Sequence, residues 1–156
     1  MQILGIDPSV RSTGYGIIEL QTATKIKVVT YGTIRNPENL SQSACYLNIT
    51  ETLRDLIRNF SPTEAALENI IYVQNTRTAI AMGGARGAAL VACAESGLNI
   101  SEYPAKVIKK SATGLGSAAK QQVGFMMRAT LGLKENPSSD EADALAIALT
   151  HSRHTT

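Results

Sequence analysis

The first part of the chain alternates short apolar runs with turn-forming residues. Residues 3–6 are a continuous apolar run that ends at Asp7, and this run predicts a buried strand. Residues 15–20 predict a second strand, and the partly alternating stretch 25–34 predicts a third. Because the connections between these runs are short, we expect an antiparallel meander.

The rest of the chain predicts mainly helices, with two further strands between them. Apolar residues at helical spacing predict a helix over 42–60, and a stretch of small residues predicts another over 76–96. The apolar run at 65–71 lies between them and predicts a strand that returns parallel to the first strand through a β-α-β crossover. The other expected elements are a strand at 98–103, a short helix from Pro104, and helices at about 117–132 and from Ser138 to near His151.

This order of elements predicts an α/β protein with an RNase H-like fold, in which helices cover both faces of a mixed five-stranded sheet. We expect one domain over residues 1–151 and a short frayed tail over 152–156. His151 and His154 lie at this boundary, and we expect both to be solvated.

Composition excludes several classes of protein. The 156 residues are 44% hydrophobic, too many for a disordered chain. No run approaches the roughly 18 consecutive apolar residues of a membrane helix. The N-terminus has no basic residue before its apolar run, which argues against a signal peptide, and Cys45 and Cys93 form no metal or redox spacing. We therefore expect a cytoplasmic protein with two free thiols.

Charge is unevenly distributed, although the net charge is only +2. Residues 104–134 contain six basic residues and no Asp or Glu. Such a segment indicates a polyanionic partner, and a solvated helix face explains it equally well. The six are Lys106, Lys109, Lys110, Lys120, Arg128 and Lys134.

Four acidic side chains occupy positions that suit metal-dependent chemistry. Asp7 ends the first predicted strand and Glu68 interrupts the fourth, so parallel pairing of these strands would bring the two together. Asp140 and Asp143, at spacing i, i+3, share one face of the last predicted helix. Clustered carboxylates repel one another unless a divalent cation is present, and oxygen-only ligands favour Mg²⁺ or Mn²⁺ over zinc.

Each of these acids also has a plain structural explanation. An Asp after a strand is commonly a turn former, and an acid at a strand edge is commonly solvated. Acids in the first turn of a helix interact favourably with the helix dipole. The four together indicate a metal site far more strongly than any one of them.

Several short motifs follow one another along nearly the whole chain. In chain order these are Leu4-Gly5-Ile6-Asp7-Pro8, Thr13-Gly14-Tyr15-Gly16, Glu68, Ala85-Arg86-Gly87, Glu102-Tyr103, Lys109, residues 114–120 and residues 140–148. In this order they resemble the motifs of the RuvC-type Holliday junction resolvases: the family's opening motif, its second acid, a segment of its long helix, its basic block and its closing acidic helix.

The resemblance implies a homodimeric, structure-selective endodeoxyribonuclease that acts in DNA recombination and repair. It would resolve four-way (Holliday) junctions by paired, symmetric nicks. Asp7, Glu68, Asp140 and Asp143 would hold two Mg²⁺ ions per subunit, with Mn²⁺ as a substitute, and hydrolysis would leave 5′-phosphate and 3′-hydroxyl ends. Related resolvases work with the RuvA–RuvB branch-migration complex, which is therefore an expected partner.

The resemblance also implies DNA-binding residues. Lys109 and Lys120 match lysines that hold phosphates beside the metals. After Glu68 the chain departs from the family, because many members carry an aromatic residue where this chain has Ile71, followed by Tyr72. Tyr72 would stack on an unpaired base, or Ile71 would insert as an aliphatic wedge. Packing of Tyr72 on the helix below is the structural alternative.

Gly83, Gly84 and Gly87 lie inside the predicted helix at 76–96. Each glycine costs a helix about 1 kcal/mol relative to alanine, so close packing must offset the loss. That packing is either within the monomer or across the two-fold axis of a dimer, and the family implies a dimer contact.

Two other functions fit the same motifs. One is a catalytically silent junction-binding protein, which the presence of all four acids disfavours. The other is an RNase H-like nuclease that acts on a different nucleic acid, such as an RNA–DNA hybrid. A dimer with two sites at fixed spacing would distinguish a junction resolvase from the second alternative.

Overall fold

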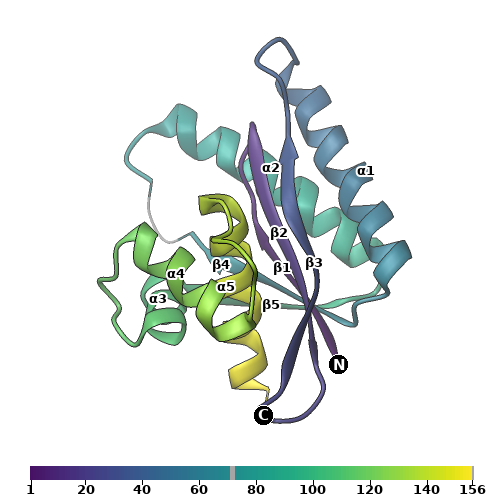
Figure 1. Ribbon diagram of the computed structural model, residues 1–156. Coiled ribbons are helices and arrows are strands. Elements are labelled where there is room, and N and C mark those ends of the chain that lie inside the picture. Colours follow the sequence, from purple (N-terminus) through teal and green to yellow (C-terminus); the bar gives the residue numbers. More distant parts are fainter. Residues whose placement is uncertain (71–72, 156) are drawn as a thin grey trace.

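The computed structural model describes residues 1–70 and 73–155, in which helices pack on both faces of a mixed sheet (Figure 1). The strand order is β3-β2-β1-β4-β5. The strands are β1 (Gln2–Asp7), β2 (Ser12–Leu20), β3 (Ile26–Arg35), β4 (Glu64–Asn69) and β5 (Asn99–Pro104). The helices are α1 (Gln42–Phe60), α2 (Thr76–Glu95), α3 (Ala105–Thr113), α4 (Lys120–Leu131) and α5 (Ser139–His154). None of these helices is long and apolar enough to cross a membrane.

The pairing of the strands confirms the predicted topology. β1 is antiparallel to β2 and parallel to β4, and β2 and β4 pair in turn with β3 and β5. Asp7 lies opposite Gly14 of β2, and Ile6 lies opposite Leu67 of β4. Glu68 follows Leu67, so the two strands deliver their acids to the same end of the sheet.

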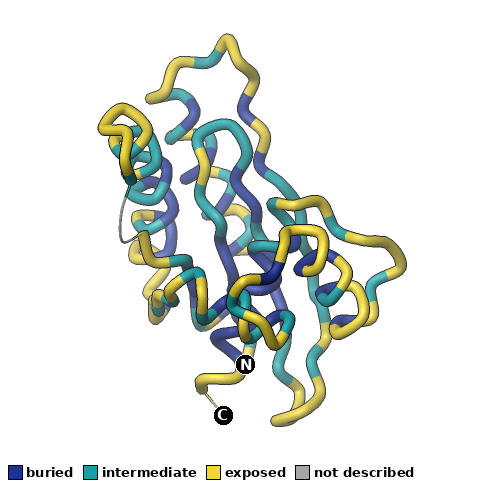
Figure 2. The backbone as a smooth tube through the Cα atoms, turned by 90° about the vertical axis from the view of Figure 1, so that its left-hand side faces the viewer, coloured by how far each residue is buried: buried dark blue, intermediate teal, exposed yellow. Residues whose placement is uncertain are grey.

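Alternation along the strands divides the core into two layers. Leu4 and Ile6 pack with residues of α1 and α2, whereas Ile3 packs with residues of α3, α4 and α5. Figure 2 shows buried residues along the strands and on the inner sides of the helices. Asp7 has the same parity as Ile3, so its side chain points toward the α3–α5 layer. Ala66 packs in that layer as well, and the parity of β4 therefore directs Glu68 to the same side.

Two glycines allow α5 to lie directly on the sheet. A Cβ atom at Gly14 would overlap the main-chain carbonyl oxygen of Asp140, and one at Gly5 would overlap that of Ala144. Any larger residue would push the helix away from β1 and β2, because a close-packed interior has no spare room. The glycines thereby set how closely α5, the helix that carries Asp140 and Asp143, approaches the sheet.

The start of α5 is as predicted, and its end is not. The Ser138 hydroxyl accepts a hydrogen bond from the Glu141 main-chain N–H, and the Glu141 carboxylate accepts one from that of Ser138 at 2.7 Å. The helix continues to His154, three residues beyond the expected end.

The expectation that His151 is solvated was wrong. Its side chain is almost fully buried, and Nδ1 forms a 2.8 Å hydrogen bond with the Tyr103 hydroxyl. Nε2 lies 3.6 Å from a Glu64 carboxylate oxygen, too far for a hydrogen bond. Burial lowers the pKa of His151, and the nearby Glu64 carboxylate opposes that shift. His154, by contrast, is exposed as expected.

The three glycines of α2 have different surroundings. A Cβ atom at Gly84 would overlap the ring of Tyr46 on α1, so packing within the monomer explains this glycine. Around Gly83 and Gly87, apart from neighbouring residues and the backbone of α2 itself, no atom of the described residues lies within 4 Å of the position a Cβ would take. These two glycines leave an open strip on the outer face of α2.

Candidate active site

Three of the four predicted acids line one cavity at the end of β1 and β4. Asp7 comes from β1, Glu68 from β4 and Asp143 from the second turn of α5, and the cavity has a volume of about 280 Å³. Lys109 of α3 and Lys120, the first residue of α4, also line it. Ala105, Ile108 and Val123 complete the lining. The arrangement places negative side chains on the sheet and α5 together with two positive ones from α3 and α4.

The electrostatics of Asp7 are dominated by burial and by its acidic neighbours. Burial, followed by the charges of Asp143, Glu68 and Asp140, raises the pKa of Asp7 from 3.8 to about 7. Lys120 opposes this shift. The carboxyl therefore titrates near neutral pH, which is typical of a functional cluster of carboxylates.

Glu68 and Asp143 show the same effect in weaker form. Burial raises the pKa of both carboxyls, and the charge of Asp143 raises the pKa of Glu68 further. Lys109 and Lys120 lower the pKa of both. The two lysines thus offset part of the repulsion within the cluster.

Asp140 stands beside the cavity, outside its described lining. The Ser12 hydroxyl at the start of β2 donates a hydrogen bond to Oδ2 of Asp140. The charge of Asp140 still raises the pKa of both Asp7 and Asp143, so the four acids form one electrostatic group. Sequence reasoning missed Ser12, since 128 residues separate it from its partner.

Arg86 of α2 contacts the main chain that carries Glu68. Its Nη1 atom donates a hydrogen bond to the main-chain carbonyl oxygen of Glu68 at 2.7 Å. The same guanidinium forms an ion pair with the Glu102 carboxylate of β5, and the arginine side chain is 15% exposed. The sequence indicated Arg86 only as part of a matching tripeptide, and its contact with β4 gives that match a physical role.

Comparison with known proteins identifies the family. The family model described as "Crossover junction endodeoxyribonuclease RuvC" matches residues 3–151. The chain belongs to the RuvC family. A relative of that name from Akkermansia muciniphila is 50% identical over 151 residues, which cover 97% of this chain and 90% of the relative. Another from Halorhodospira halophila is 45% identical over 153 residues, with coverage of 98% and 90%.

Solved structures agree with this assignment to the RuvC family. The structure titled "T. thermophilus RuvC in complex with Holliday junction substrate" is 33% identical and superposes with a TM-score of 0.92, covering 99% of this chain and 94% of that one. The yeast mitochondrial Holliday junction resolvase Ydc2 has a TM-score of 0.66 at 15% identity, over 97% of this chain and 78% of that one, and shows likeness of fold alone. The expected RuvC-type family and RNase H-like fold are therefore confirmed.

The donor chemistry of this RuvC-family site fits a hard divalent cation. Every donor is a carboxylate oxygen, which Mg²⁺ and Mn²⁺ prefer. A cation would also relieve the repulsion that raises the pKa of Asp7. In residues 1–70 and 73–155, no three Asp, Glu, His or Cys side chains converge closely enough to enclose an ion as they stand.

The expected DNA-binding residues divide into two groups. Lys109 and Lys120 lie in the cavity beside the acids, where the resemblance to the RuvC family implies them. Ile71 and Tyr72 lie outside the described residues, and their roles stay a prediction. Lys134, from the same basic segment, lies elsewhere, in a groove along β3.

Proposed function

We propose that this chain is a Mg²⁺-dependent endodeoxyribonuclease that resolves four-way DNA junctions by paired, symmetric nicks. The observation that carries the proposal is a single cavity in which Asp7, Glu68 and Asp143 face Lys109 and Lys120. Membership of a family of crossover junction endodeoxyribonucleases supports the substrate class. The solved relative in complex with a Holliday junction supports it independently.

The four acids would hold two Mg²⁺ ions per subunit, with Mn²⁺ as a substitute. When bound, the ions lower the pKa of the attacking water and stabilise the charge on the leaving 3′ oxygen. Water supplies the new P–O bond and the bond from phosphorus to the 3′ oxygen breaks. The products are a 5′-phosphate and a 3′-hydroxyl, and no side chain acts as the nucleophile.

The side chains of the chain itself bind and position the DNA. Lys109 and Lys120 hold the scissile phosphate by charge and offset the excess of carboxylates in the cavity. Ser12 orients the carboxylate of Asp140 by donating to one of its oxygens. Arg86 holds the end of β4 and thereby the position of Glu68.

We further propose that a second copy of the chain packs on the outer face of α2. Ile80 is 68% exposed and Val91 is 48% exposed. Gly83 and Gly87 lie between them on the same helical face and offer a flat strip for close approach. A homodimer built on this face would place two identical sites on one junction, which symmetric nicking requires.

A cleavage assay on synthetic DNA tests the proposed function. The chain is incubated with a four-way junction, a linear duplex or an RNA–DNA hybrid, each with Mg²⁺ or with EDTA. Asp7→Asn is compared with Asp55→Asn, which removes the same charge from an exposed surface ion pair on α1. We expect paired nicks only in the junction, and only when Mg²⁺ rather than EDTA is present. Asp7→Asn should lose this cleavage, and Asp55→Asn should keep it.

Two results would overturn this proposal. Cleavage of the hybrid in preference to the junction would identify an RNase H-like nuclease with another substrate. Junction binding without cleavage in both Mg²⁺ and Mn²⁺ would identify a silent junction-binding protein.

A further inference from the structure

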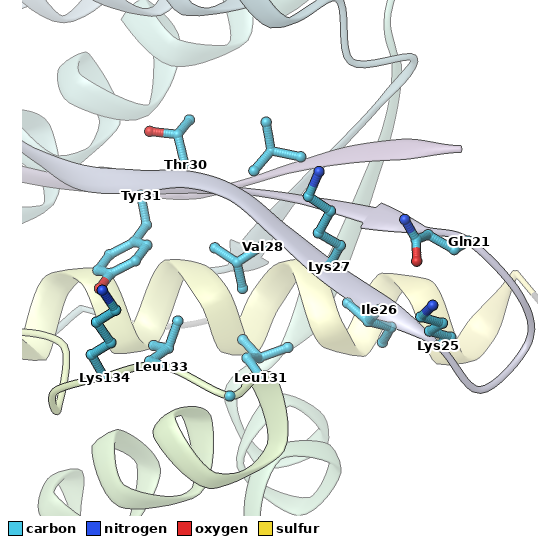
Figure 3. Close-up of a pocket in the computed structure, with 12 residues that line it drawn as sticks. Gln21, Lys25, Ile26, Lys27, Val28, Thr30, Tyr31, Leu131, Leu133 and Lys134 are labelled. Atoms are coloured by element: carbon cyan, nitrogen blue, oxygen red, sulfur yellow. The ribbon is translucent and has the colours of Figure 1, made fainter.

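A groove of about 810 Å³ follows β3, the outermost strand on one side of the sheet (Figure 3). Its apolar floor comes from both sides: Ile26, Val28 and Tyr31 from the strand, and Leu131 and Leu133 from the end of α4 and the turn after it. In Figure 3, Val28 and Tyr31 point toward this turn. All five side chains are continuous with the core layer between the sheet and α5. The floor of the groove is therefore rigid and apolar.

The charge of the groove is positive. Lys25, Lys27 and Lys134 line it, and no described lining residue is acidic. The lysines stand on both sides of the apolar floor, two near the start of β3 and one after α4. Lys27 lies between Ile26 and Val28, so its side chain points to the opposite face of β3 from the apolar floor (Figure 3). A strand added at this edge would present alternate side chains to the floor and to the face that carries Lys27.

The groove lies away from the candidate active site. In the sheet register, Lys27 pairs with Glu19, and Glu19 with Gln2 at the start of β1. Asp7 stands at the other end of β1. A ligand at the Lys27 end of the groove would therefore lie toward the opposite end of the sheet from Asp7 and Glu68, which disfavours the scissile DNA as its occupant.

The outer edge of β3 offers main-chain hydrogen bonds. Among the described strands, β3 pairs with β2 alone, so the N–H and C=O groups on its other side are free of sheet partners. Lys25 already forms main-chain hydrogen bonds with Gln21 and Thr22, and a bulge at Val29 interrupts the edge where the register shifts. Regular pairing is therefore available over residues 26–28. Residues 25–31 span roughly 20 Å, enough for about six residues of an extended peptide.

We propose that this groove binds an extended acidic segment of a partner protein, which adds to β3 as a further strand. Alternate apolar side chains of the segment cover Val28, Tyr31 and Leu133, and the acidic side chains between them point to the opposite face of β3, where Lys27 lies. A second copy of this chain would place lysine against lysine at the edge, and such edges resist self-pairing. The apolar floor distinguishes the groove from a surface that merely attracts phosphates.

Selection from a displayed library of random linear peptides, with the full chain as bait, tests this proposal. We expect enriched peptides that alternate acidic and apolar residues. Lys25→Gln/Lys27→Gln should weaken their binding about tenfold, as expected for the loss of two partly exposed ion pairs. The matched control Arg54→Gln/Arg58→Gln, which removes two charges from α1, should leave it within about twofold. Bound peptide should protect the edge amides within residues 26–28 from hydrogen exchange.

Three results would overturn the proposal. One is enrichment of peptides with no acidic bias, and another is binding that the Lys25/Lys27 variant leaves unchanged. The third is a loss of junction DNA affinity in that variant but not in the control, which would assign the groove to DNA. The Lys25→Gln/Lys27→Gln variant should cleave the junction as well as the unsubstituted chain does. Loss of peptide binding and loss of cleavage can therefore be told apart.

Discussion

Arg86 donates a hydrogen bond through Nη1 to the main-chain carbonyl oxygen of Glu68, at a distance of 2.7 Å. Its guanidinium also pairs with Glu102 of β5, so a single side chain joins α2, β4 and β5 at the edge of the candidate site. The contact is made to the main chain of Glu68, which leaves the carboxylate available for other ligands. Arg86 is thus a positioning residue for one of the four acids.

Removal of this contact should slow cleavage more than it weakens junction binding. Arg86→Ala should lower kcat roughly 10- to 100-fold, the usual effect of losing a partner that orients a metal ligand. Arg86→Lys should recover part of the loss, because an ammonium group can still donate to the carbonyl oxygen. Single-turnover cleavage and junction binding in EDTA measure the two effects separately. Equal losses in both would mean that Arg86 stabilises the fold rather than positioning Glu68.

The raised pKa of Asp7 predicts how stability depends on pH when no divalent cation is present. The folded protein holds the Asp7 proton up to about pH 7, whereas the unfolded chain loses it near 3.8. Folded protein therefore binds more protons between these values, and stability falls as the pH rises through them. From pH 5 to pH 8 the loss is on the order of 2 kcal/mol.

Chemical denaturation in EDTA at these two pH values measures this loss. Asp7→Asn removes the titrating group, so the variant should gain stability relative to the unsubstituted chain as the pH rises. Parallel pH profiles for the two proteins would contradict a raised pKa at Asp7.

Ser12 should affect metal affinity through Asp140. Ser12→Ala removes the hydroxyl that donates to Oδ2 of Asp140 and frees the carboxylate to rotate. We expect the Mg²⁺ concentration for half-maximal cleavage to rise about tenfold, with restoration by Ser12→Thr, which keeps a hydroxyl. Titration of Mg²⁺ by calorimetry provides a readout independent of activity. An unchanged Mg²⁺ affinity in Ser12→Ala would remove the residue from the site.

Gly14 should be intolerant of even a methyl group. In Gly14→Ala the new Cβ overlaps the carbonyl oxygen of Asp140, so α5 must shift away from the sheet. We expect a loss of roughly 1–3 kcal/mol in the free energy of unfolding, together with loss of cleavage. Gly124→Ala is the matched control, because its Cβ would meet only a Pro137 oxygen at 3.9 Å and a helix favours alanine. Thermal unfolding of both variants measures the difference. A similar Tm for the two would mean that α5 tolerates displacement, contrary to this prediction.

The α2 face should control the oligomeric state. Ile80→Glu places a charge on the proposed contact surface, where its burial against a second copy would be costly. We expect a monomer in sedimentation equilibrium, with the fold retained and paired nicking reduced to single nicks. Leu47→Glu, on the exposed face of α1, is the control for adding a charge to an apolar surface residue. A dimer that survives Ile80→Glu would place the interface elsewhere.

Short-range patterns were sufficient to predict the strands of the sheet and the approach of Asp7 to Glu68, but they could not predict the long-range side-chain contacts. The run 3–6 and the run after α1 set β1 and β4, and parallel pairing then brings Asp7 to Glu68. His151 was misjudged because proximity to the C-terminus indicates fraying, whereas its burial depends on Tyr103, 48 residues away. Gly84 is similar: the helix penalty is visible in the sequence, but the Tyr46 ring that requires a glycine is on another helix. Ser12 and Arg86 act through contacts that no local pattern reveals.

Because α5 packs on β1 and β2, the site is completed late in synthesis, when residues far along the chain reach the strands made first. Asp7 and Glu68 leave the ribosome early, but Asp140 and Asp143 lie in α5, which Gly5 and Gly14 receive only after β1–β5 and α1–α4 have been made. A nascent chain that stops before residue 139 holds two of the four acids and lacks the helix that covers β1 and β2. Partial products of translation that lack α5 should therefore not cleave DNA, and the site becomes competent only when α5 docks on the sheet.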